Sequence, residues 1–590
     1  MIQTIILLFC KDVSLEIVIL AFSEIFNLEK ENIQRRCHVT FPELGGDSMM
    51  AINASHRILK YAHERGTITT DNQRINASDV MQLPIHLLAQ ILRDGRDNLP
   101  KAKKARLLDV RDDVNDVLAG LSSLPTVYDC NKDFFPNNDM PLAIFKSWKI
   151  GMSMCVDSRP LFINNERDSF IISGSQGGDL LCASPAGRIF SRTSVHGKIE
   201  GDLTYLEQTS QPHTETIVYV PAYTHHSHHT SVSTTTQGRR DREDESPLNG
   251  HIHAFKLSRS NTLDHVWSYS TKGEIKSKPG TFIHSFPVVD KNDDSTNTRV
   301  HRLVVAAYDG SLSYLDAISG SLLQCDNLGG GAIHADPIVF KHGESVSVIV
   351  ASCTWKGKIT LLTLTKDTMQ VKWNIDIWTP IYASPFHYAR FGVLSIILCA
   401  VDGSVRSLNC DDGEENWKIQ AGSKPIFTQC CSIKTNQTIS TDTHCDNKAA
   451  TCDTNRDHKD SSIDSIIFGS NDGKLRCIHT LTGKMHWIID ANAPILSSPI
   501  CTEQHIICAT TAGDVIVFTV PDIPLSRYLS SEDTPNSEVA DTTSILISDA
   551  PRKSVRLDGE IFSNAVLKNN EVYFGCRDSC LYKLKLKVMI

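Results

Sequence analysis

The sequence predicts a multidomain protein, in which a small all-α domain of four helices precedes an all-β propeller with eight blades. Two observations carry this prediction. Up to about residue 94, apolar residues recur every three or four positions, as they do on one face of a helix. Beyond residue 140, the sequence repeats a unit of about 40–50 residues, which is the length of a four-stranded propeller blade.

The composition agrees with several folded units. The chain has 590 residues, of which 41% are hydrophobic and 22% are charged, so it is neither disordered nor collagen-like. Its 59 basic and 68 acidic residues give a net charge of −9, and no long basic run is interleaved with aromatic residues. We therefore expect no nucleic-acid partner.

The cysteines and the first residues indicate a cytoplasmic location. The 18 cysteines form no repeated C-x-x-C pattern, so we expect reduced thiols. Residues 1–13 are interpreted as a lead-in to a helix, because the apolar run Ile5–Phe9 lacks the preceding basic residue of a secretory signal. Charged residues such as Lys11 and Glu16 interrupt every candidate for the ~20 apolar residues that cross a membrane, so no membrane segment is expected.

Residues 14–94 are predicted to form the helical domain. Ser14 is suited to cap the first helix, a second helix is expected after Ser48, and Pro84 stands where it would begin the last one. The apolar stripes of these helices are Leu15, Ile19, Phe22 and Phe26; Met50, Ala54, Ile58 and Leu59; and Val80, Leu83, Leu87, Leu88, Ile91 and Leu92. Residues 95–140 mix charge with Asn, Asp and Pro, which is typical of a solvated linker.

The predicted propeller, residues 141–590, repeats an Ile or Val that is followed two positions later by a small residue. This period of two favours a strand. The eight occurrences are Val156-Asp-Ser158, Ile199-Glu-Gly201, Ile283-His-Ser285, Ile333-His-Ala335, Ile381-Tyr-Ala383, Ile426-Phe-Thr428, Ile495-Leu-Ser497 and Ile561-Phe-Ser563. We expect each one to open a blade.

Each repeat continues with an apolar strand, a tight turn and an alternating strand. The turns Asp309-Gly310, Asp402-Gly403 and Asp472-Gly473 suit the positive φ angles of a hairpin. Longer repeats coincide with polar insertions near 224–248, 433–461 and 525–550, which we interpret as loops on the rim. Four tryptophans precede the next Ile or Val by eight or nine positions and are expected to pack between blades: Trp148, Trp373, Trp417 and Trp487.

The order of the repeats also predicts how the ring closes. The tryptophan segment Phe145–Ile150 comes before the first complete set of strands, whereas no such segment follows the last set, which ends at Leu581–Leu584. The first and last strands should therefore share one blade, because pairing them removes an open sheet edge. Eight sets then give eight blades, with seven as the alternative if the second set is irregular.

One motif in the helical region carries specific chemistry. The segment Phe41-Pro-Glu-Leu-Gly45-Gly46-Asp47-Ser48-Met places a serine at the first turn of a helix, behind two glycines. A phosphodiester on the hydroxyl of Ser48 would face the positive end of the helix dipole. The alternative is an ordinary N-cap by Asp47 or Ser48 after a glycine turn.

The motif from Leu44 to Ser48 resembles that of acyl or peptidyl carrier domains. The resemblance implies that Ser48 carries 4′-phosphopantetheine, and that Gly45, Gly46 and Asp47 belong to its attachment site. The tail repeats, such as Leu481-Thr-Gly-Lys-Met-His-Trp487, are similar to the PQQ-like, tryptophan-docking repeats of quinoprotein alcohol dehydrogenases. A carrier followed by such a propeller resembles the C-terminal part of the beta-alanine-activating branch of the acyl-CoA synthetase family.

This resemblance implies a carrier that holds an activated amino or carboxylic acid as a thioester. It also implies two partners, a phosphopantetheinyl transferase and an AMP-forming adenylating domain or enzyme. The family has its adenylation domain before the carrier, whereas only 47 residues precede Ser48 here. We therefore expect no complete catalytic set in this chain, and we expect the propeller to be an interaction platform for an unidentified protein.

A quinone-dependent oxidoreductase is the alternative function. The adjacent Cys430 and Cys431 resemble the vicinal disulfide of some quinoproteins, but neighbouring cysteines are more often plain strand residues in a reducing compartment. No set of calcium ligands with a catalytic carboxylate is assignable, so bound pyrroloquinoline quinone is not expected. The histidine-rich segment His225–His229 is interpreted as a loop tip rather than a metal site.

Overall fold

A computed structural model gives the structure of the protein. It describes residues 13–26, 58, 61–62, 65, 85–94, 128–129 and 142–588, apart from gaps at 166–167, 211–212, 225–248, 289–295, 343–344, 391–392, 434–464, 503, 521–544 and 548–550. The chain divides into two compact units, of which the first contains Met1–Pro125 and the second most of the residues from Thr126 onward. No helix among these described residues is both long and apolar enough to cross a membrane.

Two helices are described in the first unit. Helix α2 (Val13–Phe26) starts one residue before the predicted cap, and helix α6 (Ile85–Asp94) starts directly after Pro84 in the sequence. They contact each other through buried side chains that recur at helical spacing: Ile17, Val18, Ala21 and Phe22 on α2, and Ile85, Leu88, Ala89 and Leu92 on α6. Most of residues 27–84 lies outside the described residues, so the four-helix carrier domain stays a prediction.

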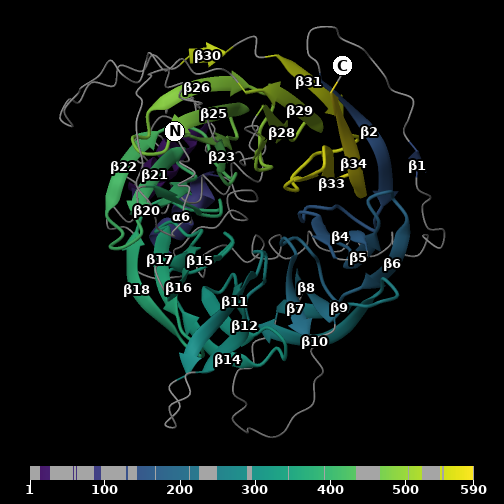
Figure 1. Cartoon of the computed structure of the whole chain (residues 1–590). Helices are drawn as coiled ribbons and strands as arrows, with labels where there is room; N and C mark the ends of the chain where they lie inside the picture. The colour runs from purple at the N-terminus through teal and green to yellow at the C-terminus, as the bar shows by residue number, and fades with distance from the viewer. Residues whose placement is uncertain are drawn as a thin grey trace, which may run out of the picture. The chain divides into compact units, whose positions relative to one another are not determined.

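The second unit is an eight-bladed propeller, in which eight sheets form a ring (Figure 1). Blade 1 contains β3 (Leu161–Asn164), β4 (Ser169–Gly174), β5 (Asp179–Ala183) and β6 (Ile189–Ser194), and blade 2 contains β7 (Thr204–Ser210), β8 (His213–Tyr223), β9 (Gly250–Leu257) and β10 (Leu263–Thr271). Blade 3 contains β11 (Gly280–Val288), β12 (Thr296–Ala306), β13 (Ser311–Asp316) and β14 (Leu322–Asn327). Blade 4 contains β15 (Ile338–His342), β16 (Ser345–Ala351), β17 (Lys358–Leu364) and β18 (Met369–Asp376).

The other four blades follow the same antiparallel plan, and two of them gain a short fifth strand. Blade 5 contains β19 (Phe386–Arg390), β20 (Val393–Cys399), β21 (Ser404–Asn409) and β22 (Glu415–Gln420), and blade 6 contains β23 (Cys431–Ile433), β24 (Ser465–Gly469), β25 (Lys474–His479), β26 (Met485–Asp490) and the parallel β30 (Ile545–Ile547). Blade 7 contains β27 (Ile500–Cys501), β28 (His505–Ala509), β29 (Asp514–Thr519) and β31 (Arg552–Arg556). Blade 8 contains β1 (Tyr128–Asp129), β2 (Leu142–Gly151), β34 (Cys580–Val588), β33 (Glu571–Cys576) and β32 (Val566–Lys568).

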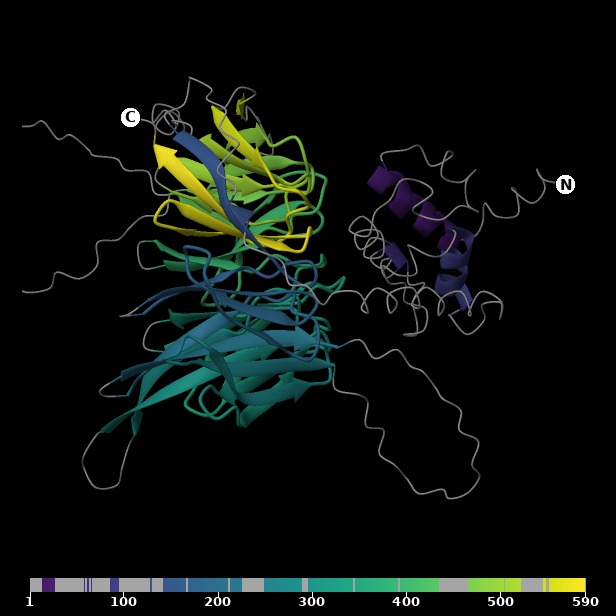
Figure 2. The same cartoon turned by 90° about the vertical axis from the view of Figure 1, so that its right-hand side faces the viewer.

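Blade 8 closes the ring as the sequence predicts. Strand β2 pairs antiparallel with β34, from Leu142 opposite Val588 to Gly151 opposite Cys580. The early β2 and the late β34 lie side by side in both views (Figure 1 and Figure 2). The predicted eight blades and the shared closing blade are confirmed, and the seven-bladed alternative is wrong.

The Ile-x-small repeat lies in the connection that enters a blade, and not in a strand as predicted. Val156 and Ser158, for example, are fully buried ahead of β3. The hydroxyl of Ser158 donates to the carbonyl of Gly174 at the end of β4, over 3.0 Å. The alternation arises because the extended connection buries every second side chain between blades.

In blade 3 the repeat has a different position from the predicted one. Ile283 and Ser285 belong to strand β11. The buried pair Ile275 and Ser277 lies before that strand, and Ser277 donates to the carbonyl of Ala306 over 3.2 Å. The prediction places the repeat within β11 because that strand also contains an Ile and a small residue two positions apart.

The predicted tryptophans pack between neighbouring blades. The indole nitrogens of Trp148, Trp373 and Trp417 donate to carbonyls in a turn of the next blade, those of Pro185, Cys410 and Thr480. Trp487 is also buried, in a core cluster shared by blades 6 and 7. The apolar cores therefore lie between blades, and the tryptophans link each blade to the next.

Replacing Gly483 by Ala should measure how tightly a tryptophan docks. Gly483 has a φ of 67°, and a Cβ there would lie 2.7 Å from the ring of Trp417. Gly329 has the same φ of 67°, but a Cβ there would meet only Lys358 Nζ, at 3.7 Å. Backbone strain should lower the free energy of unfolding by about 1 kcal/mol in both variants, and the clash should add about 1–3 kcal/mol in Gly483→Ala. Equal losses in chemical denaturation would contradict tight docking.

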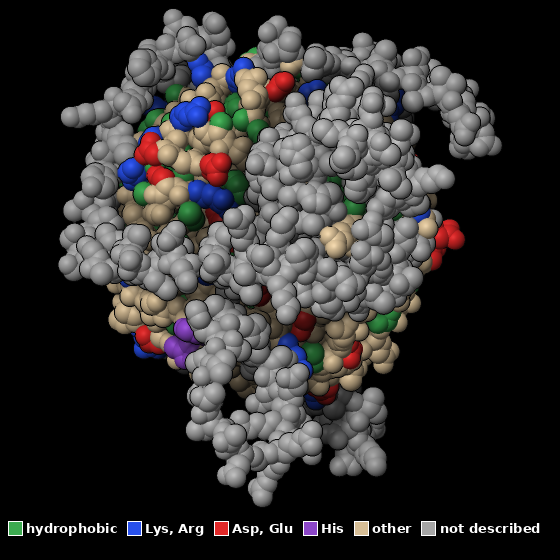
Figure 3. Space-filling model, turned by 180° about the vertical axis from the view of Figure 1, so that it is seen from behind, with side chains coloured by type: hydrophobic (Ala, Val, Ile, Leu, Met, Phe, Trp, Pro, Cys, Tyr) green, Lys and Arg blue, Asp and Glu red, His purple; other side chains and the backbone are tan. Residues whose placement is uncertain are grey.

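The three predicted insertions fall largely outside the described residues. They start after β8, β23 and β29, so each follows a strand of the repeat without interrupting one. The only described strand within them is β30, which pairs with the outer strand β26 of blade 6. On the face shown in Figure 3, the described surface carries acidic and basic side chains interspersed.

Candidate functional site

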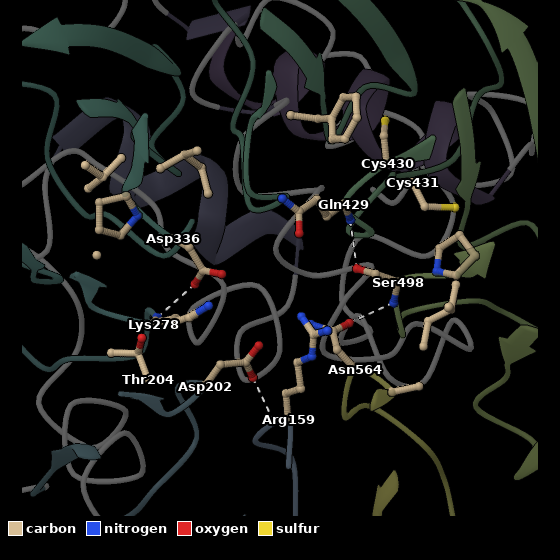
Figure 4. Close-up of a pocket in the computed structure, with 18 of the residues that line it drawn as sticks. Arg159, Asp202, Thr204, Lys278, Asp336, Gln429, Cys430, Cys431, Ser498 and Asn564 are labelled. Carbon is tan, nitrogen blue, oxygen red and sulfur yellow. Dashed lines mark hydrogen bonds between the residues drawn. The ribbon is translucent and has the colours of Figure 1, made fainter. Parts of the chain in front are cut away.

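Each Ile-x-small repeat is followed directly by one residue that belongs to a ring around a central cavity of the propeller. Each blade supplies one such residue: Arg159, Asp202, Lys278, Asp336, Ser384, Gln429, Ser498 and Asn564. All except Ser384 line a cavity of about 540 Å³. We call these eight residues the inner ring, and Figure 4 shows the labelled members facing this cavity.

Hydrogen bonds between neighbouring blades fix the inner ring. The backbone N–H of Arg159 donates to Asp202 Oδ1 over 2.7 Å, and that of Lys278 donates to Asp336 Oδ1 over 2.8 Å. On the opposite side, the N–H of Ser498 donates to Asn564 Oδ1 over 2.8 Å. Among the described residues, five bonds of this kind run from a backbone N–H of one blade to a ring side chain of the next, so five of the eight ring side chains are held in place.

The two arcs of the ring differ in charge. Blades 1–4 supply Arg159, Asp202, Lys278 and Asp336, whereas blades 5–8 supply neutral hydrogen-bonding side chains. Burial, together with the neighbouring Asp202 carboxylate, raises the pKa of Asp336 to about 6. The cavity therefore has one charged wall with both signs and one neutral polar wall.

Together, the middle residues of the eight repeats form a second layer. Its polar part contains Asp157 and Glu200, both of which accept from the amide of Gln176, over 2.7 and 3.1 Å. Arg577 pairs with Asp157 over 3.0 Å and lies over the ring of Phe562 at 3.6 Å. These contacts tie blade 8 to blades 1 and 2.

The second layer becomes aromatic in blades 4–6. The rings of His334 and Tyr382 have centroids 5.2 Å apart, and those of Tyr382 and Phe427 are 5.7 Å apart. Burial lowers the pKa of His334 to about 4, with a further contribution from the positive charge of Lys276. His334 is therefore neutral at pH 7 and acts as an aromatic packing group.

The adjacent Cys430 and Cys431 lie at the cavity wall but do not pair with each other. The sulfur of Cys430 lies 3.4 Å from that of Cys399, and the sulfur of Cys431 lies 2.7 Å from that of Cys501. All four are free thiols. Burial holds the pKa of Cys431 well above its usual value. The vicinal disulfide of quinoproteins is thus not formed here.

The residues that the sequence singles out most strongly are not covered by the structure. Gly45, Gly46, Asp47 and Ser48 lie outside the described residues, and so does the segment 225–229. Within the described parts of the chain, no group of three or more His, Cys, Asp or Glu side chains is placed to hold a metal ion.

The sequence analysis missed the inner ring. Its signal was present, because each member directly follows an Ile-x-small repeat, as Asp202 follows Gly201 and Asp336 follows Ala335. The eight residues differ in type, however, so they form no motif when the repeats are compared. In the eight predicted repeats that position is charged at Arg159, Asp202 and Asp336, whereas Lys278 follows the pair Ile275 and Ser277, which the predicted repeat of blade 3 does not include.

Two comparisons of sequence find similar proteins. A family model for the outer membrane protein assembly factor BamB matches residues 402–522, within blades 5–7 and the connections that follow them. The "Beta-alanine-activating enzyme" of Drosophila melanogaster is 24% identical over 318 residues, which are 48% of this chain and 28% of that enzyme. The chain thus spans less than a third of this relative's length, and the similarity is distant.

The comparison with solved structures finds similarities at low sequence identity. BamB from Moraxella catarrhalis has 12% sequence identity and a TM-score of 0.46, over 75% of this chain and 98% of that one. Sqt1 from Saccharomyces cerevisiae has 9% identity and a TM-score of 0.45, also over 75% and 98% of the two chains. No functional inference follows from similarities at this level.

Proposed function

We propose that this chain is a phosphopantetheine-dependent carrier in a system similar to the beta-alanine-activating enzymes. The observation that carries the proposal is the motif Leu44-Gly-Gly-Asp-Ser48, which comes before an eight-bladed PQQ-like propeller in one chain. The distant similarity to the "Beta-alanine-activating enzyme" supports it. The described helices α2 and α6, on either side of the motif, are compatible with a helical carrier.

In this proposal the hydroxyl of Ser48 is the attachment point of the arm. When bound, 4′-phosphopantetheine supplies a thiol that holds an amino or carboxylic acid as a thioester. Gly45 and Gly46 belong to the attachment site, because glycines carry no side chain that would crowd the arm, and Asp47 contributes to docking of the phosphopantetheinyl transferase. An AMP-forming adenylating domain or enzyme activates the acid, and the reaction takes place in the cytoplasm.

Loading of the arm tests the proposal. After incubation with a phosphopantetheinyl transferase and coenzyme A, the intact mass of the full chain should rise by one phosphopantetheine group. Ser48→Ala should show no mass increase, because the accepting hydroxyl is gone. Ser55→Ala is a matched control from the same segment and should be loaded like the wild type. An unmodified wild type, or a modified Ser48→Ala, would refute the carrier function.

The propeller is proposed to act as an interaction platform for another protein of the system. Its cavity and its loop-bearing faces offer binding surfaces, and propellers commonly use them in this way. The second candidate function is a quinone-dependent oxidoreductase. Purified protein that bound pyrroloquinoline quinone and oxidised an alcohol would establish that function in place of the platform.

A further inference from the structure

The charged wall of the cavity presents both signs in alternation. Going from blade 1 to blade 4, the inner ring carries Arg159, Asp202, Lys278 and Asp336, that is, a cation, an anion, a cation and an anion. Among the described residues, no ion pair within 4.0 Å joins any of these four side chains to another charged group. None of these four charges is thus held in a direct ion pair within this part of the chain, although the positive charge of Lys278 acts on Asp336 from a longer distance.

The positions of the two carboxylates do not depend on pairing with these cations. Asp202 and Asp336 accept hydrogen bonds from the backbone N–H groups of Arg159 and Lys278, and not from their charged heads. Asp336 is further tied to blade 5, because its own N–H donates to Ser384 Oγ over 3.1 Å. The carboxylates are therefore held in place while the guanidinium and the ammonium remain available.

The wall attracts groups of both signs at once. Arg159 and Lys278 would attract a simple anion, but the two carboxylates would repel it. A simple cation would be attracted by the carboxylates and repelled by Arg159 and Lys278. The mutual repulsion of Asp202 and Asp336 also favours a further positive group beside them, in addition to Lys278, which lies between them in the order of the ring. A molecule with an ammonium and a carboxylate satisfies both halves of the wall.

The opposite wall and the size of the cavity limit the ligand to a small one. Gln429, Ser498 and Asn564 offer neutral hydrogen-bonding groups, and the apolar residues Ile500 and Ala565, which follow two of them in the sequence, also line the cavity. The volume of about 540 Å³ is within the range of small-molecule sites. A short carbon chain can therefore lie against these side chains while its charged ends face the charged wall.

We propose that the central cavity binds a small zwitterion, a free amino acid with one ammonium and one carboxylate on a short chain. Arg159 and Lys278 bind the carboxylate, and Asp202 and Asp336 bind the ammonium. The neutral arc provides hydrogen bonds for the remainder of the ligand. In this proposal, binding of the zwitterion requires no loaded arm on Ser48.

Titration calorimetry on the full chain tests the site with a series of ω-amino acids. The probes are glycine, β-alanine, 4-aminobutyrate and 5-aminopentanoate, with propionate and propylamine as ligands of a single charge. One chain length should bind best, because the ring fixes the distance between the two charges. Propionate and propylamine should bind about tenfold more weakly, or worse, since each leaves half of the wall unpaired.

Paired variants assign the two halves of the wall. Arg159→Gln with Lys278→Gln, and Asp202→Asn with Asp336→Asn, should each weaken binding of the best amino acid about tenfold or more. A matched control is Lys256→Gln with Glu215→Gln, which removes an ion pair of 2.7 Å in blade 2, away from the cavity. The control should bind like the wild type. Circular dichroism confirms that each variant is folded.

Three results would overturn the proposal. They are the absence of binding for every amino acid at millimolar concentration, equal binding of propionate and the amino acids, and unchanged binding in both paired variants. The titration is repeated on Ser48→Ala, which should bind the ligand unchanged. Failure of arm loading then disproves only the carrier, and failure of binding disproves only this site.

Discussion

Deleting residues 141–151 should open the propeller and strongly destabilise it. The deletion removes β2, which pairs with β34 along its whole length, and leaves an unpaired edge in blade 8. It also removes Trp148, whose burial alone is worth about 3–5 kcal/mol of unfolding free energy. We expect a large fall in melting temperature, together with association through the exposed edge, in thermal denaturation and light scattering.

The ion pairs of β2 add to this loss. Lys149 lies 2.9 Å from Asp558, in the connection that precedes blade 8, and its hydrogen bond is the main reason why the pKa of Asp558 falls to about 2. Deleting residues 1–139 instead should leave the propeller folded, because β2 is kept and only the two-residue strand β1 is lost from the sheet. Two truncations that melt alike and stay monomeric would contradict closure by β2.

Acid should destabilise the propeller already between pH 6.5 and pH 4. Burial lowers the pKa of His253, His334 and His486 from 6.5 to about 4. The unfolded chain therefore binds protons in this window that the folded chain does not, so stability is full above pH 6.5 and falls as the pH drops towards 4. Each histidine contributes on the order of 1 kcal/mol or more at the acid end, because these side chains are only partly buried and solvent screens part of the effect.

Urea denaturation at several pH values measures this effect. Asp336 acts in the opposite direction, because its pKa is raised to about 6 and its protonation relieves a buried charge, but it is one group against three. Replacing His253, His334 and His486 by Gln should flatten the dependence between pH 6.5 and 4. A wild-type protein of constant stability over this range, or a triple variant with an unchanged slope, would refute the assignment.

The ring of blades could be predicted from the sequence because each blade repeats local signals. Turn glycines such as Gly403 and docking tryptophans such as Trp417 recur at fixed positions, and the missing last tryptophan indicates how the ring closes. The entry connections were mistaken for strands, because an extended connection that buries alternate side chains has the same period of two. In blade 3 this period also occurs within β11, and the predicted position shifted to Ile283.

The candidate site could not be predicted in the same way. Arg159 and Asp202 are 43 residues apart, and only the ring brings the backbone of one to the carboxylate of the other. Their charges matter together because they share a cavity, and no local pattern encodes that. For Ser48 the situation is reversed, since a short motif predicts its chemistry while the residue lies outside the described part of the chain.

The pairing of β2 with β34 also sets the order of events during synthesis. Strand β2 leaves the ribosome before blades 1–7, but its partner is the last strand of the propeller. At about 5–20 residues per second, β2 waits roughly 20–90 s for the strand that covers its edge. Blades 1–7 can each complete their sheets during this time, whereas blade 8 cannot. The nascent chain therefore exposes one edge of β2 throughout the synthesis of blades 1–7, and losing only β34 would leave that edge uncovered permanently.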